Sequence, residues 1–130
     1  MHEPSADQDR VASQIVDSAF AVHTTLGPGL LESVYEQCLS YELAARGLPV
    51  RRQVQQPIVY KTVQIDAGFR LDIVVSESVI VEVKAVEKLL PVHSAQLLTY
   101  LKLSGFRLGF LINFNVPLVK DGIRRIIRPI

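Results

Sequence analysis

The sequence has little of the material from which disulfides, zinc sites or membrane spans are built. It contains one cysteine, Cys38, and no tryptophan. A single cysteine excludes an internal disulfide and a cysteine-rich zinc site. No apolar stretch approaches the length of a membrane span, and the polar first ten residues, MHEPSADQDR, are unlike a secretory signal. We therefore expect an intracellular, cytoplasmic protein that does not contact a membrane.

Charge of one sign is also lacking. The formal net charge is +1, so no overall basic field attracts the chain to nucleic acid. The basic residues nevertheless cluster in two places. One cluster is Arg46, Arg51 and Arg52, and the other is Lys120, Arg124, Arg125 and Arg128. Such clusters are more often solvated surface than binding sites, but they permit phosphate binding.

The chain has enough apolar residues for a sizeable core. At 130 residues with 48% hydrophobic content, it is expected to form one compact domain. No repeat, linker or low-complexity segment divides it, and residues 1–8 are expected to be a flexible tail. This apolarity in a small domain also favours a buried subunit interface, and hence a homodimer.

Helical spacing of apolar residues occurs in three segments. The first predicted helix runs from Asp9 to Leu26, and LGPG then ends it. A second helix is predicted from about Leu30 to Arg46. A third begins at Pro91 and ends at Gly105. Its expected buried stripe consists of Ala95, Leu98 and Leu101, with Val92 as a further candidate.

Strand patterns fill most of the remaining chain. They cover residues 57–65 (with a turn at Lys61 and Thr62), 68–75, 78–86, 106–114 and 122–128. Strands covered by helices predict an α/β or α+β fold, with a mixed sheet of four or five strands flanked by helices.

The segment VIVEVKAV, residues 79–86, places charge on an otherwise apolar strand. Successive side chains of a strand point to opposite faces. One face therefore carries Val79, Val81, Val83 and Ala85, and the other carries Ile80, Glu82, Lys84 and Val86. Buried charge is costly unless it is paired or bound to a metal. Some group on the second face must therefore compensate the charge of Glu82 and Lys84.

A neighbouring carboxylate supplies a reason for this charge. If residues 76–78 form a three-residue turn, Val75 faces Val79, and Asp72 lies opposite Glu82 on the same face. Two facing carboxylates repel unless one is protonated or a cation lies between them. Oxygen ligands suit Mg²⁺ or Mn²⁺, and the carbonyl of Val83 is a further candidate ligand. The alternative is a half-exposed strand pair with surface ion pairs, because this spacing is common by chance.

Other segments make the metal-site interpretation more specific. Gly29 to Tyr35, GLLESVY, resembles the signature of the GxxExxY protein family, which belongs to the PD-(D/E)XK nuclease superfamily. The resemblance extends from about Ile15 to Arg125. It includes the segments HTTLGPGLLESVYE, FRLDIVV, VIVEVKAVE, PVHSAQLLTYLKLSG and LGFLINFNVPLVKDGIRRI.

The resemblance implies a single nuclease-like domain over residues 1–130 with a restriction-endonuclease-like core. Asp72 resembles the metal-binding aspartate of the superfamily, and Glu82 and Lys84 resemble its (D/E)xK pair. Glu32 is similar to the helical acid that supports the metal, directly or through water. Gln96 is similar to the polar residue often found on the helix after the ExK strand.

The residues expected to carry chemistry are therefore Glu32, Asp72, Glu82, Lys84 and Gln96, and the expected metal ligands are Asp72, Glu82, Glu32 and the Val83 carbonyl. Three further residues are auxiliary candidates. Tyr100 shares a helical face with Gln96, and His93 lies one turn before Gln96. Tyr35 is interpreted either as a packing residue or as a hydroxyl near the site.

The implied activity is Mg²⁺- or Mn²⁺-assisted hydrolysis of a phosphodiester in nucleic acid, either DNA or RNA. Lys84, expected to stay protonated beside two carboxylates, would orient water or phosphate rather than act as a general base. Two alternatives remain open. One is a nucleic-acid-binding or protein-interaction module that keeps the nuclease fold without turnover. The other is a metal-dependent enzyme that acts on a smaller phosphate ester.

Overall fold

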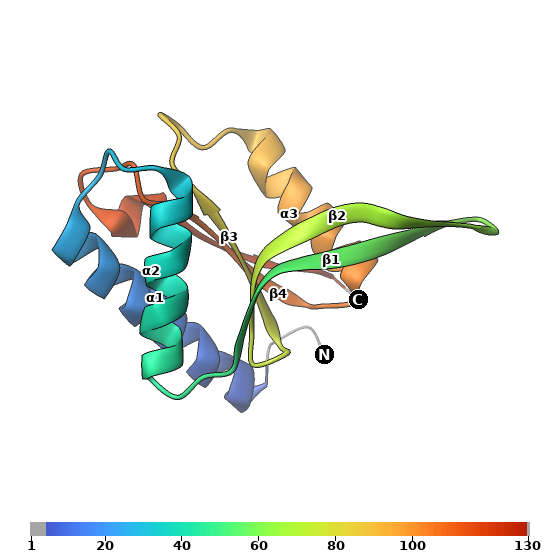
Figure 1. Cartoon of the computed structure of the whole chain (residues 1–130), viewed down its shortest axis with the longest axis horizontal. Coiled ribbons are helices and arrows are strands. Elements are labelled where there is room, and N and C mark those ends of the chain that lie inside the picture. The colour runs from blue at the N-terminus through green and yellow to red at the C-terminus, as the bar shows by residue number, and fades with distance from the viewer. Residues whose placement is uncertain (1–4, 130) are drawn as a thin grey trace.

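The computed structural model describes residues 5–129 and has three helices on a five-stranded sheet (Figure 1). In chain order the elements are α1 (Ala6–Leu26), α2 (Glu32–Ala45), β1 (Val50–Tyr60), β2 (Val63–Val75), β3 (Val79–Lys84), α3 (Pro91–Ser104), β4 (Leu108–Asn113), the short 3-10 helix η1 (Val119–Gly122) and β5 (Ile123–Ile127).

The sheet is mixed, as the sequence predicted. Its strand order is β1-β2-β3-β4-β5, and each strand is hydrogen-bonded to the next in the chain. Only β3 and β4 are parallel, which requires a crossover connection, and α3 supplies it. The other three neighbouring pairs are antiparallel.

Each face of the sheet carries its own hydrophobic core. The α1 and α2 side includes Ile15, Leu39, Ile73 and Val81, all fully buried. The α3 side is smaller and includes Ile80, Leu97, Leu101 and Leu111. Both faces of β3 are thus covered, which places Glu82 in a strand with no solvated face.

The first helix begins earlier than predicted. The Ser5 hydroxyl accepts a hydrogen bond from the backbone N–H of Gln8 (3.1 Å), and the Gln8 side chain accepts one from the backbone N–H of Ser5 (3.1 Å). This capping box fixes the start of α1 at Ala6. The prediction of a flexible tail is therefore wrong for residues 5–8, and its first four residues lie outside the described part of the chain.

The first two strands are longer than predicted. β1 begins at Val50, and β2 runs without interruption from Val63 to Val75, so two predicted strands are one. Residues 51–56 lack apolar alternation because β1 is an edge strand that stays largely exposed. The turn at Lys61 and Thr62 is confirmed. The distal parts of β1 and β2 form a two-stranded arm that projects beyond the rest of the molecule (Figure 1).

The buried stripe of α3 is also corrected. Its buried residues are Leu97 and Leu101, whereas Val92 and Leu98 are 63% and 39% exposed and Ala95 is exposed. The helix approaches the sheet closely at Gly109 of β4. A Cβ atom there would lie 3.1 Å from a methyl carbon of Leu97. The absence of a side chain at Gly109 thus selects Leu97 as the contact residue.

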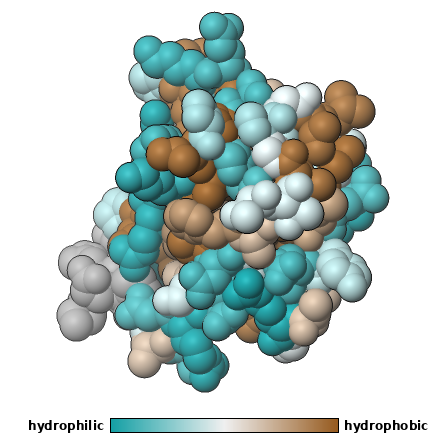
Figure 2. All heavy atoms as spheres, turned by 90° about the vertical axis from the view of Figure 1, so that its left-hand side faces the viewer, coloured by the Kyte–Doolittle hydropathy of each residue, from teal (hydrophilic) through white to brown (hydrophobic). Residues whose placement is uncertain are grey.

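The outer side of α1 and α2 is mixed in character. Figure 2 shows hydrophobic atoms in separate patches among hydrophilic ones on this side. Exposed apolar side chains of these helices and the loop between them include Phe20, Leu31 and Tyr41. No helix in the described part of the chain is long and apolar enough to cross a membrane.

Candidate active site

The β2–β3 hairpin has the register that the sequence predicted. Val75 pairs with Val79, Val74 with Ile80 and Ile73 with Val81, after which the ladder between the two strands ends. The two strands diverge at this point, and we call it the fork. A three-residue connection at 76–78 produces this register, as expected.

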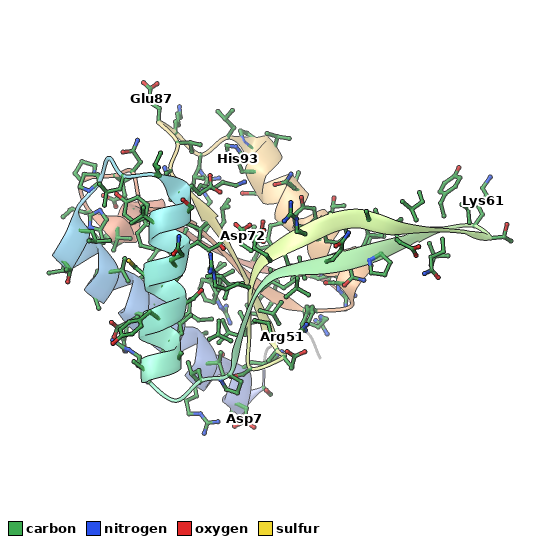
Figure 3. The ribbon with its side chains drawn as sticks, in the orientation of Figure 1. Asp7, Arg51, Lys61, Asp72, Glu87 and His93 are labelled. Atoms are coloured by element: carbon green, nitrogen blue, oxygen red, sulfur yellow. The ribbon has the colours of Figure 1, made fainter. Side chains whose placement is uncertain are left out.

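Side chains continue the hydrogen bonding where the ladder stops. The backbone N–H of Asp72 donates to Oε2 of Glu82 (2.9 Å), and the backbone N–H of Val83 donates to Oδ2 of Asp72 (2.9 Å). Each carboxylate therefore accepts a backbone hydrogen bond from the neighbouring strand, Glu82 from β2 and Asp72 from β3. Asp72 lies near the centre of the molecule, where the arm leaves the sheet (Figure 3). The two acids are adjacent, as predicted.

Burial changes the acidity of both carboxyl groups. Glu82 is 4% exposed, and burial, together with the charge of Asp72, raises the pKa of Glu82 to about 8. Burial also raises the pKa of the half-buried Asp72, to about 6, and the charges of Glu36 and Glu32 add to this rise. The backbone hydrogen bonds and the Lys84 ammonium oppose both shifts. The pair therefore holds protons well above the usual carboxyl range.

Lys84 ends β3 on the same side of the strand as Glu82. It is half-buried, and it pairs with Asn113 of the parallel strand β4. Its backbone carbonyl accepts a hydrogen bond from the N–H of Phe114 (3.0 Å), which anchors the end of the strand. Its positive charge acts on both carboxyl groups of the fork and opposes the rise of their pKa values.

A third carboxylate near the fork was not predicted. Glu36 is 5% exposed on α2, and its charge raises the pKa of both Asp72 and Glu82. Arg52 donates to Glu36 Oε2 from Nε (3.2 Å) and from a terminal nitrogen (2.8 Å). The Gln53 amide lies 2.9 Å from both Glu36 oxygens. One sequence signal existed, because Glu36 falls within the buried stripe of α2 that also contains Tyr35 and Leu39.

The predicted basic cluster at residues 46–52 divides among three glutamates. Arg46 pairs with Glu42 (3.1 Å), Arg51 with Glu77 (2.5 Å) and Arg52 with Glu36 (2.8 Å). The three arginines of the C-terminal cluster also have partners. Arg125 lies 3.6 Å from Asp9, Arg124 contacts Ser94, and Arg128 donates to the backbone carbonyl of Phe106. These ion pairs leave the described surface with few unpaired arginines.

The remaining predicted site residues differ in their relation to the fork. Glu32 is exposed at the start of α2, and its charge contributes to the raised pKa of Asp72. Tyr100 stacks on Phe69 with ring centres 4.3 Å apart. Burial raises the pKa of Tyr100, and the charges of Glu82 and Asp72 contribute. Gln96 is exposed one turn earlier, without a hydrogen-bond partner among residues 5–129.

Two auxiliary candidates hold backbone segments in place. The Tyr35 hydroxyl donates to the carbonyl of Gly27 (2.6 Å) and accepts from the N–H of Leu30 (3.0 Å), so it fixes the LGPG loop. His93 Nδ1 accepts from the N–H of Leu90 (2.9 Å) at the start of α3. Both side chains therefore bind backbone groups of their own loop or helix start, which is a structural role. His93 lies at the end of α3 away from the tip of the arm (Figure 3).

The donor set of the fork suits a hard divalent cation. Two adjacent carboxylates with raised pKa values gain most from a positive charge placed between them. No group of three or more His, Cys, Asp or Glu side chains within residues 5–129 is close enough together to hold a metal ion. The carboxylate pair would therefore need backbone carbonyl or water oxygens to complete a coordination shell.

Comparison with known proteins identifies the family. The family model described as PD-(D/E)XK nuclease superfamily matches residues 9–126. The chain belongs to the PD-(D/E)XK nuclease superfamily. The fork of this superfamily member carries the aspartate on β2 and the ExK sequence, Glu82 to Lys84, on β3.

One similar protein of known structure is itself a nuclease by its name. It is an alkaline exonuclease (LHK-Exo) from Laribacter hongkongensis, with 19% sequence identity and a TM-score of 0.45. The match covers 99% of this chain and 73% of that chain. No curated protein matches the sequence.

Proposed function

We propose that the protein is a divalent-metal-dependent nuclease that hydrolyses phosphodiester bonds in nucleic acid. The observation that carries this proposal is the buried Asp72–Glu82 pair at the fork, whose pKa values are about 6 and about 8. Such perturbed acids, placed together beside a lysine, are typical of active sites. Superfamily membership supports the same reaction class.

Asp72 and Glu82 would hold the metal, Mg²⁺ or Mn²⁺, with the Val83 carbonyl as a further ligand. Glu32 would support the metal through water, because it does not form a three-carboxylate group with Asp72 and Glu82. A cation bound there supplies Lewis-acid polarisation of a phosphate oxygen and lowers the pKa of bound water. The N–H groups of Asp72 and Val83 fix the orientation of the two carboxylates. Oriented carboxylates bind a metal with less reorganisation than mobile ones.

Lys84 would neutralise charge that develops on the phosphate during hydrolysis. Its ammonium already acts electrostatically on both carboxyl groups of the fork. A fixed positive charge beside the reacting phosphate stabilises the transition state more than the ground state. Gln96 and Tyr100 of α3 would then contact the substrate beside the fork, since Tyr100 is within electrostatic range of both acids.

We also assign the chain to the GxxExxY family, on Gly29, Glu32 and Tyr35. The structure supplies a physical reason for this spacing. Gly29 has φ of +98°, a conformation that favours glycine, and the Tyr35 hydroxyl fixes the loop on either side of it. These contacts position the start of α2, where Glu32 lies. If this loop positions Glu32 for the metal, Tyr35→Phe should reduce metal binding as well as stability.

A second candidate function is a nucleic-acid-binding or interaction module without turnover. The modest net charge and the ion pairing of the basic residues favour it. A third is hydrolysis of a smaller phosphate ester at the same fork. Both differ from the proposed function in a measurable way. A binding module needs no metal at the fork, and a small-ester phosphodiesterase would leave polymeric DNA and RNA intact.

Self-association is a further part of the proposal, and the arm offers a surface for it. Ile58 pairs with Ile65, and Tyr60 with Val63, so four apolar side chains share one face of the arm. Tyr60, Val63 and Ile65 are 62%, 56% and 46% exposed. Sedimentation of Val63→Thr would test the surface, with Val59→Thr on the opposite face as a matched control. A wild-type monomer at roughly 200 μM would rule out the homodimer.

The deciding experiment is a cleavage assay on labelled single- and double-stranded DNA and RNA. Each substrate is incubated with Mg²⁺, with Mn²⁺ and with chelator. We expect cleavage of at least one polymer with metal and none with chelator. Binding without cleavage under all metal conditions would favour the non-catalytic module instead.

A further inference from the structure

The buried carboxylate of Glu36 on α2 contacts two side chains of β1 at once, those of Arg52 and Gln53. Glu36 has a side chain that is 6% exposed, and Arg52, which pairs with it, has a side chain that is 40% exposed. Gln53 donates from its amide to the same carboxylate at 2.9 Å. Glu36 would therefore keep a hydrogen-bond donor if Arg52 moved away.

The backbone of Gln53 makes this double contact possible. Successive strand side chains normally point to opposite faces, yet Arg52 and Gln53 both reach Glu36. Gln53 has φ of +52°, in the left-handed region that non-glycine residues rarely adopt. A strained residue in a strand points to a functional constraint when the surrounding contacts maintain it.

This strained residue lies directly across from the catalytic aspartate. Arg52 pairs with Ile73 and Val54 with Leu71, so the register places Gln53 opposite Asp72. The charge of Glu36 raises the pKa of both Asp72 and Glu82. Arg52 is thus an arginine close to the fork, and it is held by a carboxylate whose charge acts on both acids of the fork.

We propose that Arg52 binds a phosphate of the nucleic-acid substrate beside the Asp72–Glu82 pair. To do so, Arg52 breaks its ion pair with Glu36, while the Gln53 amide keeps its hydrogen bonds to Glu36. This inference rests on the proposed nuclease function. Arginine suits the role because its guanidinium binds phosphate oxygens in a bidentate manner. The exchange replaces one anionic partner by another, so Arg52 is never left with an unpaired charge.

The neighbouring arginine shows why the role belongs to Arg52. Arg51 makes two short contacts to Glu77, at 2.5 and 2.7 Å, in the turn at the other end of the β2–β3 hairpin. Arg51 and Glu77 are both largely exposed. Arg51 pairs with Val74, two positions along β2 from Asp72, but its guanidinium binds Glu77 at the turn and not Glu36. Arg51→Gln is therefore a matched control, since it removes an ion-paired arginine from the adjacent position.

The test is fluorescence anisotropy of a labelled oligonucleotide, single- or double-stranded, in EDTA so that neither metal nor cleavage contributes. Arg52→Gln should weaken binding by about tenfold and lower the slope of log affinity against log salt by about one phosphate contact. Arg51→Gln should change neither quantity. Glu36→Gln should strengthen binding several-fold, because Arg52 no longer has to leave a charged partner.

The opposite expected changes in binding affinity, a loss for Arg52→Gln and a gain for Glu36→Gln, separate this role from a structural one. If the pair merely held α2 to β1, both variants would lower stability, and neither would raise affinity. Should Glu36→Gln fail to fold, Arg52→Lys decides, because it keeps the charge and the salt slope but loses bidentate binding. An Arg52→Gln variant that binds like the wild type would overturn the inference.

The metal-containing cleavage assay keeps this failure distinct from failure of the proposed function. Wild-type cleavage together with unchanged binding by Arg52→Gln overturns the Arg52 role alone. A wild type that neither binds nor cleaves any of the four substrates overturns both. Weaker binding by Arg52→Gln without any wild-type cleavage supports the Arg52 role on a non-catalytic module.

Discussion

The two ends of the β2–β3 hairpin each carry a glutamate, and the pKa values of the two side chains are shifted in opposite directions. At the turn, Glu77 is exposed, and its hydrogen bonds with Arg51 lower its pKa. At the fork, Glu82 is buried against Asp72, and burial raises its pKa to about 8. Only five positions along the chain separate Glu77 from Glu82. The contrast shows that solvent exposure and partner, rather than residue type, decide what a carboxylate can do.

The two ends also differ in how the backbone is satisfied. Near the turn the strands pair residue by residue, from Val75 and Val79 to Ile73 and Val81. At the fork carboxylate oxygens accept the N–H groups of Asp72 and Val83 instead. Buried N–H groups need partners, so opening the sheet at this point required acceptors from side chains. The same acceptors are then available to a cation.

The largest expected difference between the two ends is in activity. Asp72→Ala or Glu82→Ala should abolish cleavage, because each removes a proposed metal ligand. Glu77→Ala at the turn should cleave like the wild type, since Glu77 contacts Arg51 and solvent. Initial rates on one labelled substrate measure all three. Equal losses at both ends would show that the fork is not the reaction centre.

A smaller but distinctive difference is expected in the pH dependence of stability. A carboxyl group whose pKa is raised in the folded state binds more protons when folded than when unfolded. Its contribution is therefore fully present below about pH 4.5 and is lost as pH rises toward 8, the pKa of Glu82. Without metal, Glu82→Gln should flatten this decline, which is on the order of a few kcal/mol.

Urea unfolding of the wild type and Glu82→Gln at pH 5 and pH 8.5, in chelator, measures this effect. The two proteins should be similar in stability at pH 5 and the variant more stable at pH 8.5. A wild-type stability that rises over this range would contradict the raised pKa values. Glu77→Gln at the turn should not alter the wild-type profile in this direction.

Added metal should oppose the loss of stability at high pH, and only in proteins that keep both carboxylates of the fork. Mn²⁺ binds the ionised carboxylates, so its stabilisation should be larger at pH 8 than at pH 5. The melting temperature should rise by several degrees at pH 8 for the wild type and for Glu77→Gln, but not for Glu82→Gln. Thermal unfolding with and without millimolar Mn²⁺ provides the measurement. Equal metal stabilisation in all three proteins would place the binding site elsewhere.

The smallest effect is expected from the exposed ion pair itself. Arg51→Gln breaks a contact that solvent and salt screen strongly. It should leave the melting temperature unchanged within error at moderate salt. A clear destabilisation would mean that the turn-end pair contributes to the hairpin register, and the comparison between the two ends would need revision.

The register and the acidic pair could be predicted because short-range rules determine them. Strand alternation places Glu82 and Lys84 on one face, and the length of the turn decides which residue of β2 lies opposite. Pro91 and Gly105 bounded α3 for similar local reasons. These signals depend on neighbours along the chain, which a single sequence displays directly.

The Glu36–Arg52–Gln53 contact could not be predicted because it depends on packing between distant segments. Gln53 adopts a left-handed conformation that its residue type does not favour, and only contact with α2 makes it useful. The start of β1 could not be predicted because residues 51–56 are polar apart from Val54, so this edge strand lacks apolar alternation. The Leu97 contact likewise depends on Gly109 in a strand that follows it.

The most direct test of the account uses Lys84, which separates metal binding from catalysis at the fork. Calorimetry of Mn²⁺ binding is paired with cleavage rates for the wild type, Glu82→Gln and Lys84→Ala. We predict that Glu82→Gln loses both, while Lys84→Ala keeps metal binding and cleaves at least ~100-fold more slowly. Lys84→Arg should rescue poorly, because its charge has a different shape and reach. Cleavage by Lys84→Ala at the wild-type rate would contradict the proposed mechanism.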